Sequence, residues 1–176
     1  LRQYNNWKEK GIDIKISINI SAKQLLVDAF RSNFKSLLEQ NRVDASKINI
    51  EITEYLFLHQ SENSSKILYE LHNYGLGISL DDFGTGYSSL SYLKRFPIDY
   101  LKIDKSFMDD YDTSEGSIFI ETIVKMGQTL NMKVIAEGVE LQEQVEYLQN
   151  IGCDQYQGNY FSKPLPADDF EALYTS

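Results

Sequence analysis

The chain has 176 residues, of which 42% are apolar, and its 12 tyrosines and 9 phenylalanines can help to fill one sizeable core. Its net charge of −9 argues against a nonspecific nucleic-acid surface such as a DNA-binding face, which would be basic. No apolar run approaches the roughly 20 residues of a membrane span, and a single cysteine, Cys153, excludes an internal disulfide framework.

The predicted elements alternate between helix and strand from the first residues. Leu1, Tyr4 and Trp7 stand at helical spacing and Gly11 supplies a stop, so the chain begins inside a helix. Because a natural domain rarely starts there, we interpret residue 1 as a cloning or cleavage boundary. Short β-branched runs predict strands at 15–21, 48–54, 77–83, 100–104, 133–140 and 154–162. Helices are predicted at 24–40, 64–74, 88–95, 117–130 and 142–151.

Strands that alternate with helices indicate parallel βα units, and six units are many for a small sheet. A (β/α)8 barrel of about 250 residues has eight strands. We therefore predict an α/β fold, a TIM-like barrel whose first two strands are missing, in a single domain over residues 1–176. The exposed barrel edge should promote association.

Polar residues stand at or near the carboxyl ends of the predicted strands, where such barrels hold their active sites. On the first two strands they alternate with isoleucines, so they face away from the apolar side. The residues are Asn19, Glu51, Asp81, Asp82, Lys102, Asp104 and Glu137. An amide, several carboxylates and a lysine are thus predicted to share one rim.

Each residue alone has an ordinary explanation. Asn19 could be a strand-end residue, Glu51 could point to solvent, the paired aspartates could mark a turn, and Lys102 could form an exposed ion pair with Asp104. Together, however, these explanations place acids at the same end of consecutive strands by accident. Clustered buried carboxylates cost several kcal/mol each unless a cation compensates them, so the pattern favours a metal site.

The donor types narrow the metal. Oxygen ligands suit Mg²⁺, Mn²⁺ or Ca²⁺ rather than thiolate-bound zinc, and His59 and His72 fall in a predicted loop and helix away from the rim. Adjacent carboxylates allow one of them to bridge two ions, and paired ions activate water for phosphoryl displacement. A lysine beside them can position that water. These residues predict a metal-dependent phosphoester hydrolase.

Six strings also occur in a recognisable order. They are Asn-Ile-Ser at 19–21, Glu-Ile-Thr-Glu at 51–54, Asp-Asp-Phe-Gly-Thr-Gly-Tyr-Ser-Ser-Leu at 81–90, Lys-Ile-Asp at 102–104, Ala-Glu-Gly-Val-Glu at 136–140 and Gln-Gly at 157–158. From about the first helix to the last residues, the chain closely resembles the EAL-domain family of cyclic di-GMP phosphodiesterases. The ten-residue string is highly specific, whereas Lys-Ile-Asp alone is weak.

The resemblance implies hydrolysis of one phosphodiester of cyclic di-GMP to linear pGpG, in bacterial second-messenger signalling, with two Mg²⁺ or Mn²⁺ ions. It implies that Lys102 contacts the attacking water and that Glu137 assists as a metal-site or general-base residue. Asp81 would bridge the two metals. The implied metal ligands are Asn19, Glu51, Asp81 and Asp82.

The resemblance also implies supporting roles for Asp104 and Gln157. Glu54 would brace the loop after Asp82, at residues 83–89, which in the family couples metal binding to homodimer contacts. In proteins of this family, a diguanylate cyclase domain or a sensory domain is a common regulatory partner, and the resemblance implies that the parent protein could contain one. We expect this chain in the cytoplasm, within a parent protein that could be anchored in a membrane.

The chain departs from the family pattern in two places. No Glu-Ala-Leu precedes Asn19, and we regard the Glu-Ala-Leu at 171–173, in a predicted C-terminal helix, as a coincidence. The family's first metal-ligating Glu and a nearby Arg are therefore absent, so the first metal site is incomplete and we expect low activity of the chain alone. Asn159 stands where the family usually has an aromatic or apolar residue. The alternative prediction is an inactive cyclic di-GMP receptor or scaffold.

Overall fold

Six parallel strands form one sheet, in the order β1-β2-β3-β4-β5-β6. The computed structural model describes residues 1–54, 56, 62–85 and 93–175. The strands are β1 (Ile16–Asn19), β2 (Ile48–Thr53), β3 (Gly77–Phe83), β4 (Tyr100–Ile103), β5 (Lys133–Ala136) and β6 (Gln155–Tyr156). The helices are α1 (Arg2–Glu9), α2 (Ala22–Leu25), α3 (Asp28–Gln40), the 3-10 turn η1 (Ala45–Lys47), α5 (Glu62–Asn73), α7 (Lys105–Asp109), α8 (Ser114–Leu130), α9 (Gln142–Asn150) and α10 (Ala167–Tyr174). This succession confirms the predicted α/β class with parallel βα units.

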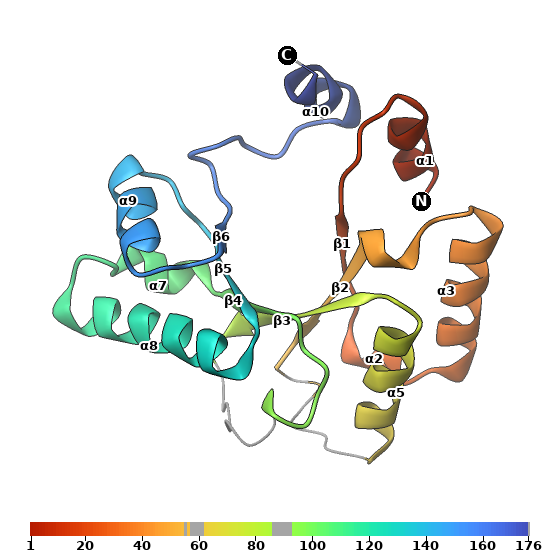
Figure 1. Cartoon of the computed structure of the whole chain (residues 1–176), viewed down its shortest axis with the longest axis horizontal. Helices are drawn as coiled ribbons and strands as arrows, with labels where there is room; N and C mark the ends of the chain where they lie inside the picture. Colours follow the sequence, from red (N-terminus) through yellow and green to blue (C-terminus); the bar gives the residue numbers. More distant parts are fainter. Residues whose placement is uncertain (55, 57–61, 86–92, 176) are drawn as a thin grey trace.

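The sheet curls into part of a barrel, with α3, α5, α8 and α9 around its outer side (Figure 1). Ile48, Ile50 and Ile52 of β2 are at most 1% exposed and belong to the same core as the α5 side chains Ile67 and Leu71. Burying an aliphatic side chain of this size contributes about 1.5–3 kcal/mol. The apolar core therefore lies on the side of the helices and leaves the inner side of the sheet to polar residues.

The helix predicted at 24–40 is divided in two. Ser21 and Gln24 form a capping box that starts α2, whereas Val27 has extended backbone angles and stands before the first residue of α3. The local cap starts a separate short helix, and the extended residue prevents the two from joining. Helix α7 was not predicted. The helix predicted at 88–95 falls largely on residues 86–92, outside the described residues, and stays a prediction.

The last two strands are shorter than predicted, and each is followed by a glycine two residues after its end. Gly138 has a φ of +72° and stands two residues beyond the end of β5. A Cβ on Gly158 would lie 2.1 Å from the carbonyl oxygen of Val139, so the two segments pass closer than any other residue allows. The backbone N–H of Val139 donates to Gln157 O at 3.0 Å there. Gly158 thus lets the segments that follow β5 and β6 approach closely enough for this hydrogen bond.

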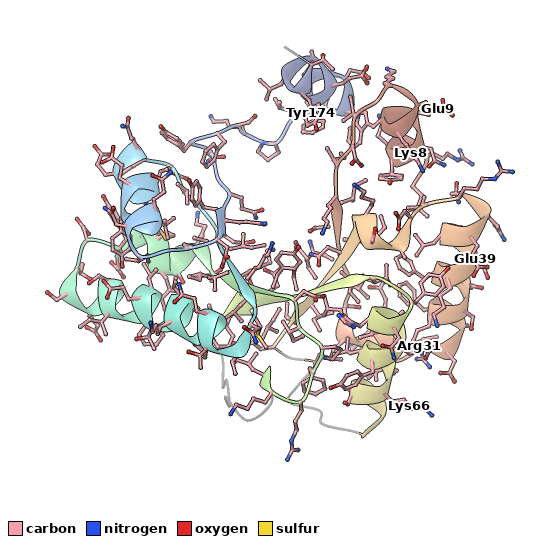
Figure 2. All side chains as sticks on the ribbon, viewed as in Figure 1. Lys8, Glu9, Arg31, Glu39, Lys66 and Tyr174 are labelled. Carbon is pink, nitrogen blue, oxygen red and sulfur yellow. The ribbon has the colours of Figure 1, made fainter. Side chains whose placement is uncertain are left out.

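Helices α1 and α10 pack against each other (Figure 1). The Trp7 and Phe170 rings have centroids 5.1 Å apart, and Lys10 Nζ lies 2.6 Å from Glu171 Oε1. The hydroxyl of Tyr174, which is labelled on α10 in Figure 2, lies 3.5 Å from Asp13 O in the segment that follows α1. Residues 171–173 accordingly lie in a helix, as predicted, and not at a strand end. Among the described helices, none is long and apolar enough to cross a bilayer.

Candidate active site

The ammonium group of Lys102 lies at the centre of a carboxylate cluster on the inner side of the sheet. Its Nζ is 2.6 Å from Glu137 Oε1, 2.8 Å from Glu51 Oε2 and 2.9 Å from Asp81 Oδ1. The Lys102 residue is only 3% exposed. Side chains from β2, β3 and β4 and from the residue after β5 therefore converge on one charged point, as the strand pattern predicted for these four residues.

A β-bulge brings two adjacent carboxylates to this rim. Leu80 pairs with Leu101 and Phe83 pairs with Ile103, so two residues of β3 face only Lys102 on β4. The extra residue belongs to the pair Asp81 and Asp82, and Asp82 has a φ of +55°. Simple alternation would point the two side chains to opposite faces, and a bulge redirects one of them. Asp82 N donates back to Asp81 Oδ1 at 3.1 Å.

The pKa values of Lys102 and Glu137 are both raised. Burial lowers the pKa of Lys102, but its hydrogen bonds to Asp81, Glu137 and Glu51 outweigh burial, so the net pKa is raised. Burial raises the pKa of Glu137, and Lys102 offsets only part of that rise. Lys102 therefore stays cationic at neutral pH, while the negative charge around it is incompletely compensated.

Asp82 and Asp104 differ in their surroundings. Burial, and then the charges of Asp81 and Asp104, raise the pKa of Asp82. Asp104 caps helix α7: its Oδ1 accepts from the backbone N–H of Ser106 at 2.9 Å and from the Ser106 hydroxyl at 2.5 Å. The hydroxyl bond is the largest of the causes that lower the pKa of Asp104. Asp104 thus has a structural role as a cap beside the cluster.

The remaining predicted residues lie around the same rim. Asn19 is exposed and is the register partner of Glu51 on the neighbouring strand. Gln157 Nε2 donates to Glu137 Oε1 at 2.8 Å. Glu54 Oε1 accepts from the backbone N–H of Gly84 at 3.0 Å, so it does contact the loop that follows β3. Of the loop at 83–89, residues 86–89 lie outside the described residues.

The donor set suits a hard divalent cation. In the described part of the chain, no three His, Cys, Asp or Glu side chains are arranged as a metal site. The Lys102 ammonium stands between Glu51, Asp81 and Glu137. That ammonium shows that their oxygens converge on a cation, and Asp82 adds a further negative charge nearby. Carboxylate and amide oxygens are the ligands that Mg²⁺ and Mn²⁺ prefer. By charge and donor type, the residues fit such an ion.

A pocket of about 470 Å³ opens beside the cluster, within the range of ligand sites. Glu137 and Gln157 line one part of it, and Lys105, Lys163 and Phe170 line others. It thus provides room and positive charge for an anionic ligand next to the carboxylates. A larger hollow of about 940 Å³ follows α8 and includes no residue of the cluster, so we do not connect it with this chemistry.

The prediction overlooked a polar layer beneath the cluster. Asn49 Nδ2 donates to Ser17 Oγ at 3.0 Å and to Ser79 Oγ at 2.7 Å. The alternation of strand residues could have revealed this layer. Ser17, Asn49 and Ser79 stand two positions before Asn19, Glu51 and Asp81 respectively, so each pair lies on the same face of its strand.

Comparisons with known proteins agree with this geometry. The family model of the EAL domain matches residues 1–164. The chain is 44% identical to the signaling protein YkoW of Bacillus subtilis over 97% of its length, and 38% identical to the cyclic di-GMP phosphodiesterase PdeR of Escherichia coli over 99%. It spans only 21% and 26% of those two proteins.

Solved structures share the fold. A complex of PaMucR phosphodiesterase with c-di-GMP superposes with a TM-score of 0.90 at 38% identity, over 96% of this chain and 69% of that one. The curated MucR is a protein of Pseudomonas aeruginosa. A Klebsiella pneumoniae BlrP1 complex with manganese and cy-diGMP has a TM-score of 0.82 at 27% identity, over 92% of this chain and 41% of that one. That BlrP1 structure therefore holds a divalent metal together with the cyclic dinucleotide.

Proposed function

Since this chain belongs to the EAL domain family, we propose that it carries the active-site residues of a phosphodiesterase that hydrolyses cyclic di-GMP to linear pGpG. The observation that carries the proposal is the convergence of Glu51, Asp81 and Glu137 on the buried Lys102 ammonium. A purely structural ion pair needs one carboxylate, whereas three around one lysine, with Asp82 nearby, leave a surplus of negative charge for a metal ion. The naming of PdeR and MucR as cyclic di-GMP enzymes supports the substrate.

We infer that Asn19, Glu51, Asp81 and Asp82 hold Mg²⁺ or Mn²⁺, with Asp81 shared between two ions. When bound, such ions supply a water of lowered pKa and neutralise the charge of a phosphodiester. Asp81 and Asp82 could both serve as ligands because the bulge brings both to the rim.

Lys102 holds a proton throughout the neutral range because its pKa is raised. It can therefore orient the attacking water through its N–H groups and oppose the charge that develops on the phosphoryl oxygens. Glu137, whose pKa is raised by burial, is suited to accept a proton from that water. Gln157 orients the Glu137 carboxylate through its 2.8 Å hydrogen bond.

Glu54 would support the site indirectly, through the backbone next to the proposed ligands. Glu54 holds the backbone of Gly84, which follows the two aspartates. We propose that Glu54 braces the loop of residues 83–89 and that this loop forms homodimer contacts. We also propose that sensory or diguanylate cyclase domains regulate the parent protein. The 176 residues contain no Glu-Ala-Leu ahead of Asn19, so we expect the chain alone to turn over slowly and its first metal site to lack one ligand.

The experiment is a titration of cyclic di-GMP hydrolysis against Mn²⁺ and Mg²⁺, with pGpG measured by chromatography. We expect pGpG to form only with the metal and to stop on chelation with EDTA. Binding of cyclic di-GMP without pGpG, at any metal concentration, would favour the second candidate, an inactive receptor or scaffold. Failure of both binding and hydrolysis would contradict the proposed substrate.

A further inference from the structure

One layer beneath the carboxylate cluster, a single amide links three neighbouring strands. Asn49 of β2 donates one Nδ2 hydrogen bond to Ser17 Oγ of β1 at 3.0 Å and another to Ser79 Oγ of β3 at 2.7 Å. Asn49 is 7% exposed and Ser79 is fully buried. We call Ser17, Asn49 and Ser79 the polar girdle. Asn49 Oδ1, in contrast, is buried with no hydrogen-bond partner among the described residues, so the two Nδ2 hydrogen bonds offset only part of the cost of burying this amide.

The polar girdle stands in a fixed relation to the proposed metal ligands. Each of its members precedes one ligand by two residues on the same strand, as Asn49 precedes Glu51. The other two pairs are Ser17 with Asn19 and Ser79 with Asp81. In a strand, side chains two residues apart project from the same face and are separated by about 6.6 Å along the strand. The girdle therefore connects the bases of the three strands that carry the ligands.

The backbone leaves space for this link. A Cβ on Gly77 of β3 would lie 2.9 Å from Asn49 Oδ1, which is closer than such atoms approach one another. Gly77 is the register partner of Asn49, and its φ is not positive. Its missing side chain, and not its conformational freedom, is what the Asn49 amide requires. Strand β3 therefore leaves space for the Asn49 side chain at Gly77 and offers it a hydrogen-bond acceptor at Ser79.

The link matters most for β1. This strand has four residues, and among the described strands it pairs with β2 alone. Ser17 and Asn19 are exposed, so β1 lacks the burial that holds β2 and β3 in place. The Asn49 to Ser17 hydrogen bond is a side-chain tie that adds to the backbone ladder between β1 and β2. It links β1, which carries Asn19, to the strand that carries Glu51.

We propose that Asn49 is a positioning residue that sets the spacing of Asn19, Glu51 and Asp81 and thereby the affinity for the divalent cation. The inference rests on the proposed function, because it takes these three residues as ligands. Metal–ligand distances tolerate only about 0.2 Å of error. Outer residues that orient ligands change metal affinity about 10–100-fold when they are replaced.

The experiment measures the Mn²⁺ dissociation constant of the protein by isothermal titration calorimetry and by the electron paramagnetic resonance signal of free Mn²⁺. Asn49→Ala removes both hydrogen bonds and should weaken Mn²⁺ binding about 10–100-fold. Gly77→Ala keeps the amide but displaces it, and it should weaken binding in the same direction. Asn5→Ala is the matched control, because Asn5 Nδ2 donates to Asn41 O at 2.7 Å from α1, outside the site. It should leave Mn²⁺ affinity unchanged.

Ser17 gives a pair of variants that do not endanger the fold, since it is exposed. Ser17→Ala removes the hydroxyl that accepts from Asn49, and Ser17→Thr retains it. We expect Ser17→Ala to weaken Mn²⁺ binding and Ser17→Thr to match the wild type. This comparison decides the proposal if Asn49→Ala fails to fold. A merely structural role would lower the unfolding midpoint of Ser17→Ala without moving the Mn²⁺ dissociation constant.

The outcomes separate the two proposals. If the wild type binds Mn²⁺ and the Asn49 and Ser17 variants bind it equally well, the positioning role is wrong while the proposed function stands. If the wild type binds no Mn²⁺, the proposed metal chemistry is overturned, and the positioning role with it. Weakening in both the girdle variants and Asn5→Ala would show a general effect of destabilisation and would also overturn the positioning role.

Discussion

Lys102 Nζ, on β4, lies 2.6 Å from Oε1 of Glu137, the residue that follows β5. The same ammonium also contacts Glu51 and Asp81. It is the only cation within hydrogen-bonding distance of these three carboxylates among the described residues, so it holds together groups that would otherwise repel. The lysine therefore supplies the positive charge that stabilises the cluster, and in the proposed reaction it would also stand beside the phosphodiester.

Replacing Lys102 should destabilise the fold in a way that metal reverses. Lys102→Met leaves three carboxylates in a nearly buried site without their cation, and breaking such a pair costs about 3–5 kcal/mol. Urea denaturation should show this loss in metal-free buffer, and Mn²⁺ should restore part of it because the ion binds the freed carboxylates. Lys47→Met is the control, since Lys47 pairs with the exposed Asp13 and should cost less than about 1 kcal/mol. Equal losses in both variants would contradict the central role of Lys102.

Asp81→Asn should abolish turnover with little effect on the fold. The change removes the negative charge through which the Asp81 side chain would bind two ions, and it keeps the shape of the side chain. We expect conversion of cyclic di-GMP to pGpG to fall by more than about 100-fold, beyond the loss typical of an outer residue, while circular dichroism stays unchanged. Asp112→Asn changes an exposed aspartate and serves as the control. Full activity of Asp81→Asn would refute the two-metal assignment.

The alternation of strand residues predicted the fold class and the convergence of Glu51, Asp81, Lys102 and Glu137, because parallel strands place their carboxyl ends at one rim. It could not predict the bulge at Asp81 and Asp82, since a bulge depends on pairing with β4. The capping role of Asp104 was missed for a related reason. Lys105–Asp109 is too short to show a helical period, so nothing in the pattern indicated a helix to cap.

The Glu54 carboxylate should hold the end of β3 through a charged hydrogen bond. Glu54 Oε1 accepts from Gly84 N at 3.0 Å, and Gly84 has a φ of +99°. Hydrogen bonds to charged groups contribute about 1.5–3 kcal/mol. In Glu54→Ala, amide hydrogen exchange at Gly84 should therefore accelerate about 10–100-fold, which is the equivalent of about 1.4–2.7 kcal/mol.

Glu54→Gln retains an oxygen acceptor and should show an intermediate rate of exchange at Gly84. The Cys153 amide, which donates to Leu148 O at 2.9 Å, provides an internal reference on a different part of the sheet. If exchange at Gly84 and at Cys153 accelerated together, global destabilisation would explain the result, and Glu54 would have no particular hold on this loop.

The Cys153 thiol should make the fold less stable above pH 9. Burial raises its pKa from an ordinary 9.0 to about 11, and Sγ lies 3.3 Å from Gln155 O. Below pH 9 both the folded and the unfolded chain carry the thiol proton, so the contribution is constant. Between pH 9 and 11 only the unfolded chain loses it, so unfolding becomes more favourable as the pH rises. At pH 10.5 the loss should reach about 2 kcal/mol.

Cys153→Ala removes this titration, so the measurement is the difference between the unfolding free energies of the wild type and the variant at pH 8 and at pH 10.5. We expect that difference to shrink by about 2 kcal/mol at the higher pH. Other groups that titrate in this range are common to both proteins and cancel, and Tyr147, whose pKa burial raises to about 12, lies above the window. A difference that stays constant would mean that the thiol ionises as easily in the fold as in the unfolded chain. The accompanying expectation is that thiol reagents modify native Cys153 slowly at pH 8, because a buried neutral thiol is a poor nucleophile.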